Sequence, residues 1–353
     1  MKPLKILHLS FCYTQGGIHN MMSDIIRHQI LDGHDVSLLI VSDVIDSRVI
    51  CNLPEEVKLY KAHRPKGSKN PYYAYIMYKI IQRQIKPDVI HCHDSISGPI
   101  LMFDRRPRIH TVHDTVYSTR CYGFFDYIVA ISDSVKEHVL DTFKTDKIKT
   151  IYNGIDFSLI DTRNRYVDDD TFKMVIVSRL VHVKKGHDLL LKAMNRLKPK
   201  TNKKLMLDIV GDGASREYLF NMVEDLGLSE NVCFLGAKER SWVYKHLKDY
   251  DLLVQPSRYE GFGLTIVEGF AAKIAVLASD IDGPKEILDD GKYGYTFQSE
   301  NLDSLCDTLK DIINKPAQLM WKKIENDYTY MKRNFSIETT AKNYVELYRQ
   351  LLN

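Results

Sequence analysis

The segment Ser257–Phe270 (SRYEGFGLTIVEGF) combines glycines and carboxylates in a spacing that suits a phosphate-containing ligand. Gly261 and Gly263 follow a predicted strand, and a helix is expected to begin directly after them. Such a loop brings backbone N–H groups close to a ligand, and the helix N-terminus behind it attracts anions. Glu260 and Glu268 lie on either side, where they can accept hydrogen bonds from the hydroxyls of a nucleotide sugar. A tight turn with a surface acid and a helix-dipole acid would have the same spacing, so both interpretations stay open.

Basic residues follow another predicted strand in the segment Val177–Leu190 (VSRLVHVKKGHDLL). Arg179 and one of the lysines Lys184 and Lys185 can converge on a diphosphate. Cations held there stabilise the negative charge that grows on a leaving diphosphate. A solvated basic loop is the alternative interpretation.

A glycine pair, Gly16 and Gly17, follows the first predicted strand. It does not form the G-x-G-x-x-G pattern of a dinucleotide-binding loop. The pair indicates either a place where the backbone approaches a ligand or an ordinary turn between a strand and a helix.

Four histidines lie near the ends of two predicted strands: His91, His93, His110 and His113. Histidines in such positions can hold a metal ion. Because side chains alternate between the two faces of a strand, we predict that the members of each pair separate to opposite faces and that no metal site forms. We expect His113 to contact a sugar hydroxyl instead.

Short apolar runs alternate with amphipathic segments along the whole chain, which predicts doubly wound parallel sheets. Strands are expected at residues 4–10, 35–41, 88–92, 108–112 and 127–131, and again at 172–177, 204–210, 232–235, 251–254 and 274–278. The highly charged stretch 161–170 between the two series is expected to be a linker. We therefore predict an N-terminal domain of residues 1–157 and a second domain of residues 158–335, with a final helix, 336–353, that packs back on the first. Ligands of such sheets bind at the carboxyl ends of the strands.

The composition is that of an ordinary globular protein, with 353 residues of which 44% are hydrophobic and 27% charged. That length exceeds what one core supports, and the net charge of +3 does not indicate nucleic acid. No apolar run is long enough for a membrane span, and the first residues are expected to form a strand rather than a signal peptide. Six cysteines without a C-x-x-C pair favour free thiols in a reducing cytoplasm.

The sequence resembles the retaining glycosyltransferases of family 4, the group 1 glycosyl transferases. These enzymes have the GT-B fold, in which two Rossmann-like domains face each other across a cleft. The resemblance rests on the Gly16-Gly17 loop and on the segments KPDVIHCH, TVHD, VAIS, IYNGID, SRL, KKG, IVGDG, FLG and PSRYEGFGLTIVEGFAA.

The resemblance also implies roles for individual residues. Glu260 would hold the donor sugar, Arg179 and Lys185 would pair with its diphosphate, and His113 would contact the sugar from the first domain; these four form the implied catalytic set. The family places its lysine five residues after the arginine and directly before a glycine, so Lys184 stays open as the alternative to Lys185. The implied donor-binding residues are Gly16, Gly17, Lys184, Gly211, Gly261, Phe262, Gly263, Leu264, Thr265 and Glu268.

The implied activity is that of a hexosyltransferase, which transfers a sugar from UDP or GDP to an acceptor hydroxyl with retention. The resemblance implies no cofactor and no metal, and a role in the synthesis of cell-surface polysaccharide or lipid-linked glycans. A sugar-nucleotide epimerase or a catalytically silent scaffold of the same fold is the alternative.

A basic and tyrosine-rich segment suggests where the protein acts. Residues 56–110 carry eleven basic side chains against four acidic ones, and NPYYAYIMYKII within them has four tyrosines. Bases and aromatic rings together suit lipid headgroups. We therefore expect a cytoplasmic protein that contacts the inner face of the cell membrane through residues 58–86. An amphipathic core helix preceded by a basic surface loop is the alternative.

Overall fold

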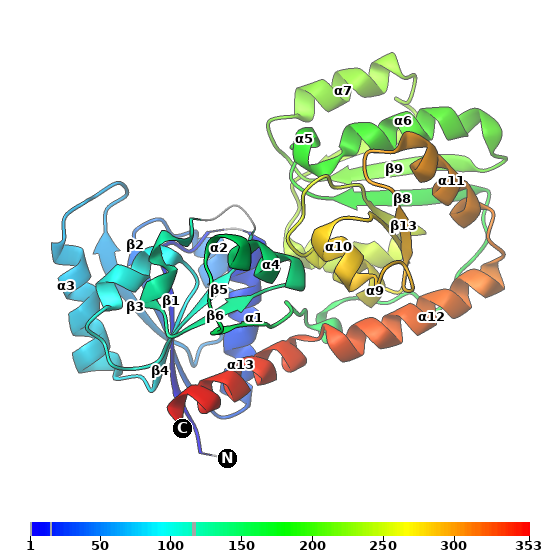
Figure 1. The fold of residues 1–353 in the computed structure, drawn as a ribbon. Helices are drawn as coiled ribbons and strands as arrows, with labels where there is room; N and C mark the ends of the chain where they lie inside the picture. Colours follow the sequence, from blue (N-terminus) through cyan, green and yellow to red (C-terminus); the bar gives the residue numbers. More distant parts are fainter. Residues whose placement is uncertain (1, 15, 115–117) are drawn as a thin grey trace. The chain divides into compact units, whose positions relative to one another are not determined.

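The computed structural model describes residues 2–14, 16–114 and 118–353, which form two compact units. The first unit contains the residues up to 155 together with 335–353, and the second contains residues 156–334. Each unit is built around one parallel sheet with helices packed on it (Figure 1). The two doubly wound sheets that the alternating pattern predicts are therefore present.

The first sheet has seven strands in the order β3-β2-β1-β4-β5-β6-β7. The strands are β1 (Lys5–Ser10), β2 (Asp35–Ser42), β3 (Lys58–Arg64), β4 (Val89–Cys92), β5 (Arg108–Val112), β6 (Tyr127–Ala130) and β7 (Ile148–Thr150). The strand order reverses between β1 and β4, which are hydrogen-bonded neighbours. In doubly wound sheets the crevice for a ligand opens at this point, outside the carboxyl ends of the strands.

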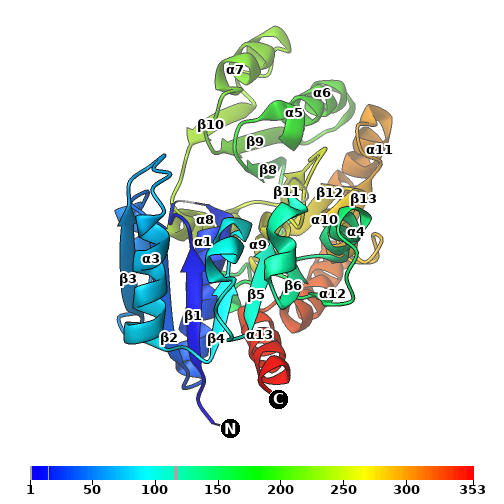
Figure 2. The same cartoon turned by 60° about the vertical axis from the view of Figure 1, so that its left-hand side comes forward.

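The helices of the first unit connect these strands. They are α1 (Gly17–Leu31), α2 (Ser47–Ile50), α3 (Tyr72–Lys79), which continues into a π-helical turn (Ile80–Ile85), the 3₁₀ segments Ser95–Leu101 and Thr119–Phe124, α4 (Asp133–Thr142) and α13 (Ile337–Leu352). The last of these, α13, packs against α1 (Figures 1 and 2). Its residues Tyr344 and Tyr348 are fully buried in the same core as Ile25 and Ile26.

The second sheet has six strands in the order β10-β9-β8-β11-β12-β13. The strands are β8 (Thr171–Val177), β9 (Lys204–Val210), β10 (Val232–Gly236), β11 (Leu252–Gln255), β12 (Ala275–Ser279) and β13 (Tyr295–Phe297). The order reverses between β8 and β11, which pair directly. The loops that follow these two strands contain the glycine-rich and basic segments singled out in the sequence, so they lie at the switch point of the sheet.

The helices of the second unit connect its strands and pack on the sheet. They are α5 (His182–Lys185), α6 (His187–Leu197), α7 (Arg216–Asp225), α8 (Arg240–His246), α9 (Leu264–Ala271), α10 (Asp282–Ile287), α11 (Leu302–Ile313) and α12 (Ala317–Asn334), with short 3₁₀ segments at Phe157–Leu159, Lys198–Lys200 and Leu247–Asp249. In the described part of the chain, no helix is long and apolar enough to cross a membrane.

The charged stretch 161–170 does not form the predicted linker. It packs on the second unit, where Tyr166 is buried in the core and Asp168 forms an ion pair with Lys203. The backbone N–H of Asp161 donates to the carbonyl of Tyr244. The high charge of this stretch therefore reflects a solvated outer face, which a count of charges does not distinguish from a linker.

Candidate functional site

The glycine-rich loop after β11 leads directly into a helix, as its sequence predicts. Gly263 precedes α9 with φ of +106°, a left-handed conformation that glycine adopts without steric cost. The N-cap residue Gly263 has no side chain to cap the first turn of α9, in which the backbone N–H of Ile266 donates to the carbonyl of Gly263 at 2.9 Å. The start of this helix carries the positive end of the helix dipole, which favours an anionic ligand.

The side chain of Glu260 is held in this loop by two donors. Lys185 Nζ lies 2.5 Å from Glu260 Oε2, and Gln255 Nε2 donates to the same oxygen at 2.8 Å. Thr265 Oγ1 donates to Gln255 Oε1 at 2.5 Å, which fixes the orientation of the Gln255 amide. The amine of Lys185 therefore meets the glycine-rich loop.

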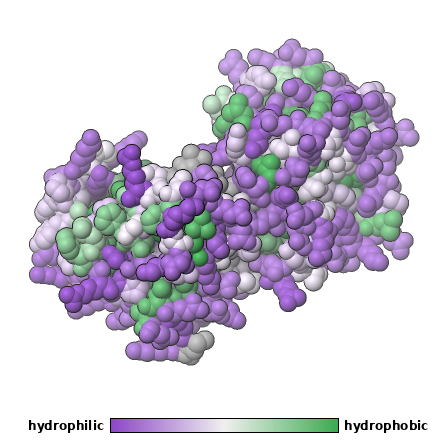
Figure 3. All heavy atoms as spheres, in the orientation of Figure 1, coloured by the Kyte–Doolittle hydropathy of each residue, from purple (hydrophilic) through white to green (hydrophobic). Residues whose placement is uncertain are grey.

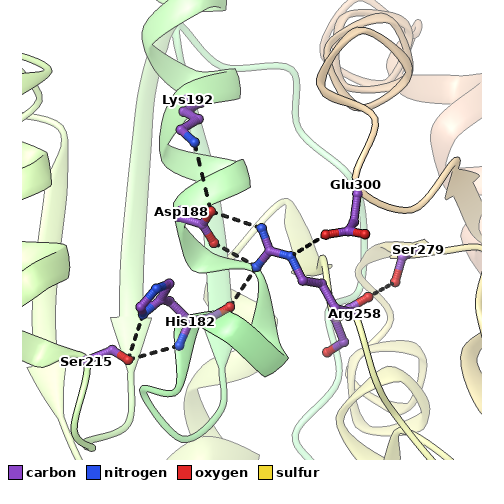
Figure 4. Close-up of polar contacts among 8 residues, drawn as sticks. His182, Asp188, Lys192, Ser215, Arg258, Ser279 and Glu300 are labelled. Atoms are coloured by element: carbon purple, nitrogen blue, oxygen red, sulfur yellow. Dashed lines mark hydrogen bonds and ion pairs between the residues drawn. The ribbon is translucent and has the colours of Figure 1, made fainter.

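Arg258 ties the glycine-rich loop to the basic loop that follows β8 (Figure 4). Its Nη1 and Nη2 donate to the two carboxylate oxygens of Asp188 at 2.9 and 3.0 Å, and Nη1 also donates to the carbonyl of His182 at 2.7 Å. Its Nε donates to Glu300 at 3.0 Å, and its backbone N–H donates to the carbonyl of Lys184. This fork of charge-assisted bonds holds the two loops in one geometry.

The charge of Asp188 depends on that fork. Burial by itself disfavours ionisation, yet the hydrogen bonds and charge of Arg258 hold the pKa of Asp188 below its ordinary value. The carboxylate is therefore ionised at neutral pH. The stability that it contributes is present above its unfolded pKa and is lost as the pH falls through the lower folded pKa.

Two glycines allow the strand-end loops to pack backbone against backbone. A Cβ on Gly186, where φ is +67°, would lie 1.8 Å from the carbonyl oxygen of Pro256. A Cβ on Gly211, where φ is +142°, would lie 1.9 Å from the carbonyl oxygen of Ser178. Only glycine fits either position, so the loops after β8, β9 and β11 meet more closely than side chains would allow.

The other predicted donor-binding residues of the second unit lie around the same loops. Arg179 follows β8 and is exposed, whereas Phe262 is buried. Leu264 and Thr265 open α9, and Glu268 lies one turn further along it and is half-buried. The structure thus brings Lys185, Glu260 and Thr265 into one hydrogen-bonded group, and it adds Gln255 and Arg258, which the sequence analysis missed.

In the first unit, Gly16 and Gly17 lie exposed at the start of α1. A Cβ on Gly16 would meet nothing within 4 Å, so the packing of the protein does not require a glycine there. The approach of a ligand to this loop stays a prediction.

The prediction that the histidine pairs separate across the sheet is wrong for His91 and His93. Their ring centroids lie 4.3 Å apart, because residues two positions apart share a face of a strand. His110 lies on the other face, where its ring stacks on Phe125 with centroids 4.9 Å apart.

The shared face gathers a third ring, His8 of β1, so that ligand atoms of His8, His91 and His93 lie within 4.8 Å of one another. All six ring nitrogens of these three described histidines have hydrogen-bond partners. One bond joins two of the rings to each other, and the other partners are Gln29, Thr111, His113 and Tyr348. This cluster is therefore satisfied as a hydrogen-bonded network.

A pocket opens beside this network at the carboxyl ends of β1, β4 and β5. It is lined by residues of these strand ends, among them Ser10, His93 and His113, and by Ile18 and His19 of α1. Burial lowers the pKa of His113 to about 3 and the pKa of His93 well below its ordinary value, so both rings are neutral at physiological pH.

Comparison with known proteins covers nearly the whole chain. A model described as "Glycosyl transferases group 1" matches residues 161–332, and one described as "Glycosyltransferase Family 4" matches residues 15–159. An uncharacterized glycosyltransferase of Methanocaldococcus jannaschii is 28% identical over 337 residues, covering 82% of this chain and 83% of the relative. The poly(ribitol-phosphate) alpha-N-acetylglucosaminyltransferase of Staphylococcus aureus is 29% identical over 189 residues, covering 53% of this chain and 36% of that protein.

Solved structures agree in fold. A glycosyltransferase from Rickettsia africae superposes with a TM-score of 0.82 at 20% identity, covering all of both chains. An Anabaena protein solved in complex with UDP and glucose superposes with a TM-score of 0.80 at 20% identity, covering 98% of this chain and all of that one.

Proposed function

We propose a function from the premise that the chain belongs to the glycosyltransferases of family 4 and has the GT-B fold. In this proposal it transfers a sugar from a nucleoside diphosphate to an acceptor hydroxyl with retention of the anomeric configuration. The observation that supports this proposal best is the ion pair between Lys185 and Glu260 beside the uncapped N-terminus of α9. A cation, a carboxylate and the positive end of a helix dipole are then available to a donor at the end of this sheet.

The donor diphosphate is expected to occupy the N-terminus of α9, where Arg179 and Lys185 neutralise its charge. Two cations and a helix dipole can stabilise a leaving diphosphate without a metal ion. Glu260 accepts hydrogen bonds from the donor sugar, and Glu268 accepts them from the ribose. The Anabaena structure with UDP supports a uridine donor, with GDP as the alternative.

The contacts of Glu260 bear on the mechanism. A double displacement needs a carboxylate that is free to attack the anomeric carbon. Glu260 Oε2 is instead engaged by Lys185 and Gln255, so it is suited to binding. We therefore propose a front-side reaction: the bond from the anomeric carbon to the phosphate oxygen breaks, the bond to the acceptor oxygen forms on the same face, and the acceptor proton passes to the leaving phosphate. The enzyme supplies orientation and charge stabilisation.

A thermal-shift panel with UDP, GDP, ADP and CMP tests the donor site, each nucleotide being added with magnesium and with EDTA. A ligand that binds only the native state at 100 times its Kd stabilises it by roughly 2.7 kcal/mol. We expect one diphosphate to raise the melting temperature, and to raise it equally in EDTA. A shift that disappears in EDTA would contradict the metal-independent site.

A surface of the first unit supports contact with the membrane, where a lipid-linked acceptor would lie. Tyr72 and Tyr75 on α3 are 59% and 54% exposed, while Met77 on the same helix is buried. Lys79 Nζ lies 5.0 Å from the centroid of the Tyr75 ring. On the face drawn in Figure 3, hydrophobic residues lie in separate groups among hydrophilic ones, so such contact would depend on basic and aromatic side chains together.

Vesicle flotation tests this contact. We expect the protein to float with vesicles that contain anionic lipid and to remain unbound with purely zwitterionic vesicles, because basic residues near an anionic surface contribute about 1 kcal/mol each. Replacement of Tyr72 and Tyr75 by serine should weaken the binding. Equal flotation with both kinds of vesicle, or none with either, would contradict the proposed membrane contact.

A further inference from the structure

A chain of four buried side chains runs through the first unit and ends in the pocket beside His113. Gln29 Oε1 lies 2.8 Å from His8 Nε2, and His8 Nδ1 lies 3.0 Å from His93 Nε2. His93 Nδ1 in turn lies 3.3 Å from His113 Nε2. The four residues come from α1, from β1 and from the loops after β4 and β5, and none is more than 9% exposed.

The amide of Gln29 determines the direction of every bond in this chain. Its Nε2 faces the hydroxyl of Tyr348 on α13 at 3.4 Å, so its Oε1 faces His8 and accepts. The Tyr348 hydroxyl also lies 2.7 Å from His91 Nδ1, to which it can donate its own proton while accepting from Gln29. Both contacts of the Tyr348 hydroxyl are thus consistent with one orientation of the amide.

The protons of the histidines then follow by elimination. A neutral imidazole has one N–H donor and one bare nitrogen acceptor. His8 donates from Nε2 and accepts at Nδ1, so His93 donates from Nε2 and accepts at Nδ1. His113 must therefore donate from Nε2, which leaves its Nδ1 bare. Burial lowers the pKa of His8 to about 4, which keeps the first ring of the chain neutral as well.

His113 Nδ1 is the open end of the chain. It is buried and has no hydrogen-bond partner among the residues that the structure describes, and His113 lines the pocket. A buried acceptor without a donor is costly, so a ligand that fills the pocket gains by supplying a hydrogen. A hydroxyl can do so, whereas an ether or carbonyl oxygen cannot.

We propose that Gln29, His8 and His93 are positioning residues that fix His113 in the tautomer with a bare Nδ1, so that the site selects a sugar bearing a hydroxyl that donates to this nitrogen. The inference rests on the proposed function, since it starts from the predicted contact of His113 with a hydroxyl of the donor sugar. It deepens that function by assigning the polarity of the contact and three positioning residues, of which Gln29 and His8 belong to no motif quoted from the sequence.

Histidine-selective ¹⁵N NMR of the ligand-free protein tests the tautomer directly, because bare and protonated ring nitrogens have well separated shifts. We expect His113 to be protonated at Nε2 in the unsubstituted protein. Gln29→Met removes the acceptor at the start of the chain, and we expect it to give a mixture of His113 tautomers. Gln82→Met is the matched control, because Gln82 lies in the same unit and bonds Asp104 instead.

Kinetics with a series of monodeoxy donor sugars provides the second readout. We expect the loss of one particular hydroxyl to lower kcat/KM about tenfold, the effect of one hydrogen bond, with a smaller loss in Gln29→Met than in the unsubstituted protein. Should Gln29→Met not fold, Tyr348→Phe, which removes the acceptor of the Gln29 amide, replaces it.

The outcomes separate the two proposals. Two results would overturn the inference even if sugar transfer is demonstrated. One is protonation of His113 at Nδ1 in the ligand-free protein, and the other is a His113 tautomer that stays unchanged in Gln29→Met or in its replacement Tyr348→Phe. The predicted tautomer in a protein that neither binds nor turns over any sugar nucleotide would leave the hydrogen-bond chain intact and refute the proposed function instead.

Discussion

Replacement of Lys185 by methionine is expected to lower kcat about 10²–10³-fold, the usual cost of removing one preorganised group that stabilises developing charge. The amine lies 2.5 Å from Glu260 Oε2 and belongs to the loop that meets the start of α9. In the proposed reaction its removal takes away a cation beside the leaving diphosphate, and it also removes one of the two donors that orient Glu260. Initial rates of donor-dependent nucleotide release measure the effect.

Lys184→Met is the matched control, since it removes the same charge one residue earlier. Because Lys185 is the lysine that is paired with Glu260, we expect Lys184→Met to lower kcat much less than Lys185→Met does. Both variants should melt within a few degrees of the unsubstituted protein. A larger loss in Lys184→Met than in Lys185→Met would show that the assignment of the two lysines is reversed.

Replacement of Gly186 by alanine is expected to destabilise the second unit far more than the same change at Gly227. The two glycines have nearly equal φ angles, +67° and +64°, so each alanine bears the left-handed conformational cost of about 1–2 kcal/mol. A Cβ at Gly227 would meet nothing within 4 Å, whereas a Cβ at Gly186 would lie 1.8 Å from the carbonyl oxygen of Pro256. Overpacking of this kind adds roughly 1–3 kcal/mol.

Urea denaturation followed by tryptophan fluorescence measures this difference, because both tryptophans, Trp242 and Trp321, belong to the second unit. The midpoint should fall in both variants and should fall further in Gly186→Ala, with similar slopes. Equal midpoints in the two variants would mean that the loops after β8 and β11 do not need their close contact.

The fold was largely predictable because most strands of a doubly wound sheet are buried on both faces and appear as continuous apolar runs. The strands that the pattern missed lack this property. β3 (Lys58–Arg64) is an edge strand with three basic residues, and β7 and β13 have three residues each. An edge strand is buried on one face only, and a strand of three residues is very short. Neither gives a continuous apolar run that the sequence reveals.

The site was predictable where its parts lie close together in the sequence. The glycine-rich loop and α9 form one segment, and so do the basic loop and Gly186. What joins the two segments was not predictable: Arg258 pairs with Asp188, seventy residues earlier, and Gln255 is a lone polar residue at the end of a buried strand. The choice of Lys185 over Lys184 likewise depends on a contact that spans 75 positions.

The histidines show a different limit. Their spacing of two was enough to place His91 and His93 on one face, and the prediction failed through the wrong use of the strand period. That His8 joins them follows only from the order of the strands, since β1 and β4 are neighbours in the sheet although His8 and His93 are 85 positions apart in the chain.

The most direct test of the proposed sugar transfer is the anomeric configuration of the sugar released from an α-linked nucleotide sugar, followed by proton NMR before mutarotation. UDP-glucose is the first donor to use, followed by the donor class that the thermal-shift panel selects. We predict that the nucleoside diphosphate is released together with the α-anomer, to water or to an added acceptor. Early release of the β-anomer would contradict retention, and a donor epimer formed without any nucleotide release would show an epimerase instead.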